Sequence, residues 1–269
     1  LAGEGLNKDP AWAERMKGWI RQGIDLGVKA ITLNGTFEPT TSPNYMEIIR
    51  FCRENDLWVT LVTNGSTLNR ARLEDLYELE VNILTKINVP MVHQDDPRYN
   101  LFCEIQKELS GRGNAQETYE FQRWLIEEMI DVGFNRTLDP AKTRMGVESV
   151  ITTSNIEYLP ELVLQLRDQN IYAHIEVTKV QGFAHNNRYL APSKAQLQGL
   201  FEVLAHQDKS IGFEPWEPRP PYVASSCHEN LFRLDIHANG TVRPCPGVEV
   251  TLGDLNHDAM AEIVRHDKL

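Results

Sequence analysis

The sequence predicts an α/β fold in which parallel strands alternate with helices, followed by a small C-terminal region of different character. The clearest evidence is the stretch of residues 29–65, which reads as strand, polar loop, helix, strand and polar loop. After about residue 190 this pattern gives way to a Pro-rich stretch and an Asn-Gly hairpin signal. Apolar runs that read as strands, with helical patterns between them, lie near residues 29–34, 58–63, 82–88, 147–152 and 171–178.

The stretch of residues 29–65 predicts a parallel strand–helix–strand unit. Ser42 is expected to cap its helix, with Pro43 at the first helical position, where the missing N–H costs nothing. Tyr45, Ile49 and Cys52 fall on one face of that helix. Two strands joined by one helix run parallel, so the loops at residues 34–39 and 63–65 open at the same carboxyl edge of the sheet. Ligands of α/β proteins bind at that edge.

The remaining elements follow in order along the chain. Asp9-Pro10 begins a helix whose Trp12 and Trp19 are expected to pack in a core, and Asn69 caps a later helix. Residues 91–115 form a long polar segment with a short helix near 102–109, expected to cover a site or to be mobile. Residues 196–205 predict another helix, and residues 213–221 are too rich in Pro for regular structure and read as a linker.

Composition excludes several classes of function. The 269 residues carry 27 Lys and Arg against 38 Asp and Glu, a net charge of -11, so nucleic acid is not an expected partner. We find no apolar run of about 18 residues and no signal peptide, so no membrane span is expected. Four cysteines in a chain of this size do not make a disulfide scaffold, and a reducing cytoplasm is the expected location.

The C-terminal region predicts a β-hairpin flanked by two cysteines. Phe232, Leu234 and Ile236 alternate, then Asn239-Gly240 forms the turn. Cys227 precedes the first strand and Cys245 follows the second, so the fold is expected to bring both thiols to the open end of the hairpin. The histidines at positions 174, 185, 228 and 237 have no zinc-type spacing.

The strand that ends in Gly35-Thr36-Phe37-Glu38-Pro39 and the later strand that ends in Thr-Asn-Gly resemble the radical S-adenosylmethionine superfamily, whose Gly-Gly-Glu-Pro motif is altered here. The hairpin with its two cysteines resembles the SPASM and twitch regions of the same superfamily. The resemblance implies a partial (β/α)6-type, TIM-like barrel over residues 1–190 and a SPASM/twitch-like region over residues 191–269. It also implies that the first strand and cluster loop precede Leu1, so the chain is expected to be an N-terminally truncated fragment.

The resemblance further implies where S-adenosylmethionine binds. Glu38 is expected to accept hydrogen bonds from its ammonium group, and the alternative for Glu38 is a solvated loop acid. Arg98 either approaches the carboxylate of the cofactor or pairs with the nearby Asp95 and Asp96. The full set of expected cofactor-binding residues is Gly35, Glu38, Pro39, Thr63, Asn64, Asn88 and Asn155.

Iron–sulfur chemistry is implied in the same way. Cys227 and Cys245 would ligate an auxiliary iron–sulfur cluster, and the alternatives are a disulfide or two free thiols. Cys52 and Cys103 are assigned no ligand role, because free cysteine commonly behaves as a small hydrophobe. The Cys-x3-Cys-x2-Cys motif that holds the catalytic [4Fe–4S] cluster does not occur in these residues. The fragment alone is therefore expected to be inactive, and no catalytic residue is assigned.

The intact parent is expected to use a [4Fe–4S] cluster and S-adenosylmethionine to make a 5′-deoxyadenosyl radical that modifies a peptide or small-molecule substrate. An electron donor such as ferredoxin or flavodoxin would be its partner. The alternative is a non-catalytic or degenerate barrel that serves as a peptide-binding partner module, a reading that the altered Gly35-Thr36-Phe37 favours.

Overall fold

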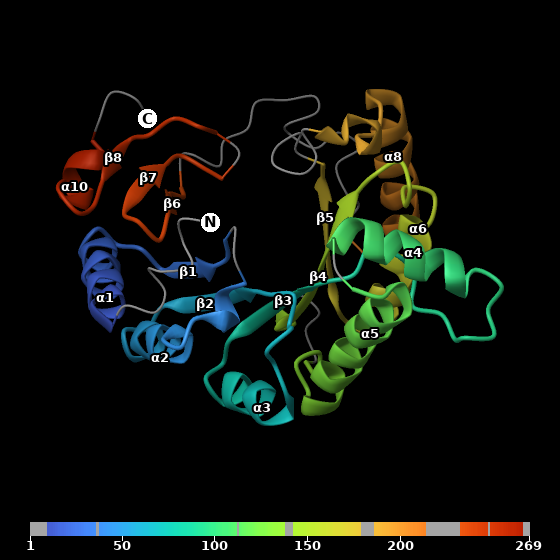
Figure 1. Cartoon of the computed structure of the whole chain (residues 1–269), viewed down its shortest axis with the longest axis horizontal. Coiled ribbons are helices and arrows are strands. Elements are labelled where there is room, and N and C mark those ends of the chain that lie inside the picture. Colours follow the sequence, from blue (N-terminus) through green and yellow to red (C-terminus); the bar gives the residue numbers. More distant parts are fainter. Residues whose placement is uncertain are drawn as a thin grey trace. The chain divides into compact units, whose positions relative to one another are not determined.

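The computed structural model describes residues 10–35, 38–111, 113–137, 142–178, 186–213, 232–246 and 248–265. It divides into two compact units. One, the terminal unit, combines Leu1–Val81 with Ser226–Leu269, and the other, the central unit, is Asn82–Ser225. Each unit is described by itself below, with its elements labelled as in Figure 1.

The main sheet contains all the strands expected from the sequence, in the order β1-β2-β3-β4-β5. In the terminal unit β1 pairs parallel with β2, and in the central unit β4 pairs parallel with both β3 and β5. The expected parallel sheet is thereby confirmed, with β5 at its edge. The strands are β1 (Ala30–Leu33), β2 (Trp58–Val62), β3 (Asn82–Lys86), β4 (Met145–Ile151) and β5 (Tyr172–Val177).

The helices of the terminal unit that accompany the main sheet are α1 (Pro10–Asp25), α2 (Tyr45–Glu54) and α3 (Arg70–Glu78), with a short 3-10 helix, η2 (Pro39–Thr41). Asn69 caps α3 as expected, its side chain accepting the N–H of Arg72 at 3.0 Å. The expected cap of α2 at Ser42 is wrong, because α2 begins later, after Asn44. The hydroxyl of Ser42 instead accepts the N–H of Asn44 at 3.3 Å, which makes a turn before the helix.

The C-terminal part of the terminal unit is a small antiparallel sheet that packs on α1. Its strands are β6 (Asp235–Ile236), β7 (Thr241–Arg243) and β8 (Gly253–Asp254), followed by α10 (Met260–Ile263). The hairpin expected at Asn239-Gly240 is confirmed. The indole of Trp12 donates to the carbonyl of Ala238 at 3.0 Å, and that of Trp19 donates to the carbonyl of Leu255 at 3.2 Å. Trp19 shares one apolar core with Val242 and other residues of this small sheet and of α10.

The helices of the central unit are α4 (Tyr99–Ser110), α5 (Ala115–Val132), α6 (Leu159–Asp168) and α8 (Lys194–Ser210), with a 3-10 turn, η4 (Arg188–Leu190). The segment of residues 91–115 is more regular than the sequence suggests, because α4 begins three residues before the expected helix. Phe102 and Ile105 of α4 are buried, which anchors that helix in the core. None of the described helices combines the length and the apolar character needed to cross a membrane.

The two faces of the main sheet differ in the central unit. Along β4, the side chains of Val147, Ser149 and Ile151 are fully buried, whereas those of Glu148 and Val150 are only partly so. The same alternation continues in β5, because the residues paired with Glu148 and Val150 are also partly exposed. We call the side that carries these partly exposed residues the open face of the sheet.

Candidate functional site

Glu38 joins the loops that follow β1 and β2. Its Oε1 accepts hydrogen bonds from the backbone N–H of Thr40 at 3.2 Å, from the hydroxyl of Thr40 at 2.7 Å and from the hydroxyl of Thr63. Its Oε2 accepts the backbone N–H of Asn64 at 2.7 Å. The structure therefore brings together three of the residues expected at the carboxyl edge, namely Glu38, Thr63 and Asn64.

The carboxylate of Glu38 is held firmly but is not saturated. Oε1 takes three donors, while Oε2 takes the amide of Asn64. Each oxygen of an ionised carboxyl offers about two acceptor positions, so Oε2 can accept one more donor. Pro39 opens η2 directly after it, and the described Gly35 is exposed. Thr36 and Phe37, which replace the usual glycine, lie outside the described residues. This arrangement suits the recognition of an ammonium or N–H group.

Asn88 and Asn155 meet in a buried network in the central unit. Asn155 is fully buried, and its Nδ2 donates to the carbonyls of Asn88 and Val150, each at 2.9 Å. Its Oδ1 accepts the backbone N–H of Thr152 at 2.8 Å. Asn88 in turn accepts the N–H of Val150 at 2.9 Å through Oδ1, and its own N–H donates to Gln106 at 2.9 Å.

We call these residues the asparagine network. It fastens the segment after β3 to the end of β4 and the turn that follows it. The structure thus brings together Asn88 and Asn155, two more of the expected site residues, by contacts that are structural. Direct contact of either with a cofactor stays a prediction.

A row of polar side chains on the open face was missed by the sequence analysis. Lys86 of β3 is paired in register with Glu148 of β4, which is paired with His174 of β5. The Nζ of Lys86 lies 3.1 Å from the Oε2 of Glu148. Ligand atoms of Glu148, His174 and Glu176 all lie within 4.8 Å of one another. We call these four residues the polar row. The alternation of these polar residues with buried ones was visible in the sequence. Only the register between the strands shows that their side chains lie close together.

Arg98 takes the second of its two expected roles. Its guanidinium bonds to Asp96 at 2.9 Å and to Glu161 of α6 at 2.6 Å. The hydrogen bonds from Arg98 hold the pKa of Asp96 below its usual range. The side chain thereby fastens the start of α4 to α6.

Three of the four cysteines lie in described residues, and each has a free thiol. Cys52 is fully buried and Cys103 is 3% exposed. Burial raises the pKa of Cys52 to about 11 and also raises that of Cys103, so both favour the protonated thiol. Cys245 is partly exposed after β7, while Cys227 lies outside the described residues. The expected convergence of Cys227 and Cys245 therefore stays a prediction.

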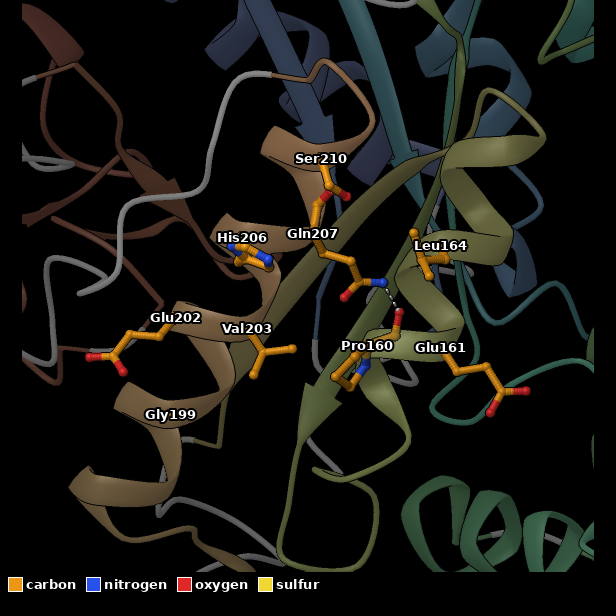
Figure 2. A pocket seen from close by; sticks show the side chains of 9 residues that line it. All are labelled: Pro160, Glu161, Leu164, Gly199, Glu202, Val203, His206, Gln207 and Ser210. Carbon is orange, nitrogen blue, oxygen red and sulfur yellow. Dashed lines mark hydrogen bonds between the residues drawn. The ribbon is translucent and has the colours of Figure 1, made fainter.

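A shallow groove of about 850 Å³ lies between α6 and α8. Figure 2 shows the side chains that line it. Leu164 and Val203 line it from opposite helices, and Gln207 donates to the carbonyl of Pro160 at 2.8 Å. Glu161 lies at one side, already paired with Arg98, and His206 lies on α8. The groove lies between two helices, and none of the described residues that the sequence predicts for a site lines it.

No protein-family model matches the chain. A tungsten-containing aldehyde ferredoxin oxidoreductase cofactor-modifying protein from Pyrococcus furiosus is 27% identical over 146 residues, which cover 54% of this chain and 36% of that protein. The match thus spans about a third of the curated relative's length.

Solved structures share the fold at low identity. SuiB of Streptococcus suis, bound to S-adenosylmethionine, has a TM-score of 0.68 at 17% identity over 96% of this chain and 59% of its own. SuiB bound to the precursor peptide SuiA has a TM-score of 0.67 over 95% of this chain and 58% of its own. The structure of anSMEcpe with AdoMet and the Cp18Cys peptide has a TM-score of 0.61 at 14% identity, covering 95% and 72%.

The similarity extends over nearly the whole chain, so it includes both the parallel sheet and the C-terminal hairpin. The resemblance that the Glu-Pro loop and the hairpin indicate is thereby confirmed in the fold. The chain has the partial (β/α) barrel of the radical S-adenosylmethionine enzymes.

Proposed function

We propose that this chain binds S-adenosylmethionine at the carboxyl edge of β1 and β2. The observation that carries the proposal is the Glu38 carboxylate, fixed by Thr63 and Asn64 with Oε2 able to accept another donor. Oε2 would accept the ammonium group of the cofactor, with Gly35 and Pro39 beside it. Thr63 and Asn64 would hold the carboxylate of Glu38 in place. Asn88 and Asn155 would shape the neighbouring loops through the asparagine network.

The whole protein, in this proposal, is a radical S-adenosylmethionine enzyme that modifies a peptide. SuiB with its precursor peptide and anSMEcpe with its peptides support this substrate class over a small molecule. The chain spans less than two thirds of SuiB, so the activity belongs to the proposal for the whole protein. S-adenosylmethionine would supply a 5′-deoxyadenosyl radical, with ferredoxin or flavodoxin as the electron donor.

The catalytic [4Fe–4S] cluster does not fit the cysteines of this chain. Such a cluster takes several thiolates, and burial keeps Cys52 and Cys103 protonated inside the core. No step is therefore derived through it, and its ligands would belong to a longer protein. The auxiliary cluster remains a proposal for Cys227 and the partly exposed Cys245.

The test is titration calorimetry of the 269-residue chain with S-adenosylmethionine. Glu38→Ala should weaken binding at least tenfold, about 1.4 kcal/mol, because the ammonium loses its charged acceptor. Glu54→Ala removes an exposed acid at the end of α2 and should leave the dissociation constant unchanged. Circular dichroism would show that both variants fold. An unchanged dissociation constant in a folded Glu38→Ala variant would remove Glu38 from the site.

The second candidate is the non-catalytic peptide-binding module. The observation that favours it is that three local donors already share Oε1, so Glu38 has a structural role without any cofactor. Reductive incubation of the full-length protein with S-adenosylmethionine separates the two candidates. Release of 5′-deoxyadenosine supports the enzyme, whereas peptide binding without that release supports the module.

A further inference from the structure

The polar row places a nitrogen ligand and two carboxylates together on the open face of the central unit. Glu148 and His174 are register partners on β4 and β5, and Glu176 follows on the same side of β5. One ligand atom from each lies within 4.8 Å of the other two. Both strands are held in a hydrogen-bonded ladder, so the three side chains start from fixed backbone positions.

One atom of this group lacks a hydrogen bond. The Oε2 of Glu148 is buried and has no hydrogen-bond partner among the described residues. The charge of Lys86 lies 3.1 Å away, but that ion pair does not have hydrogen-bond geometry. The Glu148 side chain is only 12% exposed, so water satisfies little of it. Lys86 therefore supplies a charge to this oxygen but no hydrogen bond, and a cation that coordinates the oxygen directly would improve its contacts.

The chemistry of the donors narrows the class of cation. Imidazole nitrogen with carboxylate oxygen suits zinc, manganese, iron and cobalt better than it suits calcium or magnesium, which prefer oxygen ligands throughout. The carboxylates of Glu148 and Glu176 both attract a cation, although Lys86 beside Glu148 already supplies one positive charge. His174 lies beside the ring of Tyr172, with centroids 6.1 Å apart, so its imidazole has a neighbour that limits its rotation.

We propose that Glu148, His174 and Glu176 bind a divalent transition metal ion, with zinc as the first candidate. Metal–ligand bonds of about 2.0–2.2 Å require the three ligand atoms to close in through side-chain rotation. Three protein ligands leave a coordination position for water or for a substrate oxygen. A peptide carbonyl or carboxylate is the kind of group that would bind there. This site is independent of S-adenosylmethionine, so it stands or falls separately from the proposed function.

The experiment titrates the metal-free 269-residue chain with Zn²⁺ alone, by calorimetry, and then with Co²⁺, by visible absorption. Wild type should bind Zn²⁺ in a step that His174→Ala and Glu176→Gln each weaken at least tenfold. The Co²⁺ spectrum should show bands of nitrogen and oxygen ligation without a thiolate charge-transfer band, which excludes the cysteines. His206→Ala, an exposed histidine on α8, is the matched control and should bind as wild type does.

Lys86→Met gives a test with the opposite sign. Removing the ammonium beside Glu148 should tighten Zn²⁺ binding about threefold or more, because like charges repel. Zinc should also raise the melting temperature of wild type but not of His174→Ala. Equal Zn²⁺ affinity in wild type and folded His174→Ala overturns the proposal. So does Lys86→Met that binds no more tightly, since Lys86 would then be the resident cation of a plain ion-pair cluster.

Discussion

The asparagine network and the polar row lie in the same unit, at the same sheet, and yet differ in how their polar atoms are satisfied. In the network, both polar atoms of the fully buried Asn155 are bonded, to Val150 of β4, to Thr152 after it and to Asn88 after β3. In the polar row, Glu148 has a buried oxygen with no hydrogen bond, and Lys86 is 46% exposed. The first arrangement is fully hydrogen-bonded without any ligand, whereas in the second Lys86 gives the buried oxygen of Glu148 a charge but no hydrogen bond.

This difference separates structural from functional polar residues better than position does. Asn88 and Asn155 follow strands of the parallel sheet, on the side where ligands of α/β folds bind, whereas His174 lies within β5. A polar group with all its bonds made inside the protein stabilises the fold and has little left for a ligand. A polar group with an unmet atom and an exposed neighbour can still gain from binding. Variants of the asparagine network, of the polar row and of their neighbours test this distinction.

Asn155→Ala should have the largest effect on stability. It removes bonds to Thr152, Val150 and Asn88, and leaves buried backbone groups without partners. We expect the free energy of unfolding to fall by about 2–4 kcal/mol. Urea denaturation of the 269-residue chain measures it.

The matched control for that variant is His174→Ala in the polar row. Its side chain is partly exposed, and its loss should change the free energy of unfolding by less than about 1 kcal/mol. Equal losses for the two variants would break the comparison, since the polar row would then be as structural as the network.

Gly146→Ala should lower the stability by an intermediate amount. It tests whether the open face has free space beside the polar row. A Cβ at this position of β4 would lie 2.5 Å from Cδ1 of Leu84 and 3.4 Å from the ring of Tyr172. The polar row therefore has a packed layer next to it, and the extra methyl should destabilise the chain by about 1–2 kcal/mol. Thermal unfolding measures the change.

Gly199→Ala on α8 is the control for Gly146→Ala. A Cβ there meets no atom within 4 Å, and alanine favours helix, so this variant should gain up to about 1 kcal/mol. An unchanged stability of Gly146→Ala would mean that the open face has room for a methyl group between Leu84 and Tyr172.

Alkylation of cysteines in the folded chain perturbs the fold least of these tests. It compares a buried thiol with a partly exposed one. Burial raises the pKa of Cys52 to about 11, so iodoacetamide at pH 8 should label Cys245 and leave Cys52 unlabelled in peptide mapping. In the unfolded chain Cys52 ionises near its ordinary 9.0. The stability it contributes is therefore present below pH 9 and is lost as the pH rises toward 11. Labelling of Cys52 at pH 8 in the folded chain would contradict its burial.

The strands and most helices could be predicted from the sequence, because the patterns that indicate them lie within each element. The apolar runs of β1 to β5 and the cap at Asn69 depend on neighbouring residues, and both are confirmed. β8 was missed, since the two residues Gly253–Asp254 carry no alternation. The cap at Ser42 was wrong because a turn and a helix start compete for the same hydroxyl.

The candidate site was harder to predict, because it depends on register between strands. Glu148 and His174 meet only because β4 and β5 pair at that step, and nothing in either strand alone states the pairing. Glu38 was identified from its motif, but its bonds to Thr63 and Asn64 required the fold. The hydrogen bonds of Asn155 likewise depend on the fold, since Asn88 comes from the segment after β3, 67 residues earlier.

The packing of α1 on the C-terminal hairpin has a consequence for how this protein is made. Trp12 bonds to a carbonyl 226 residues further along, and Trp19 to one 236 residues further along. At typical elongation rates of about 5–20 residues per second, a ribosome needs roughly ten to fifty seconds to deliver those partners. During that interval the part of α1 that carries Trp12 and Trp19 lacks the C-terminal residues that cover it in the folded chain. A nascent chain of this protein should therefore depend on chaperones early in translation, and release from them should coincide with the arrival of the hairpin.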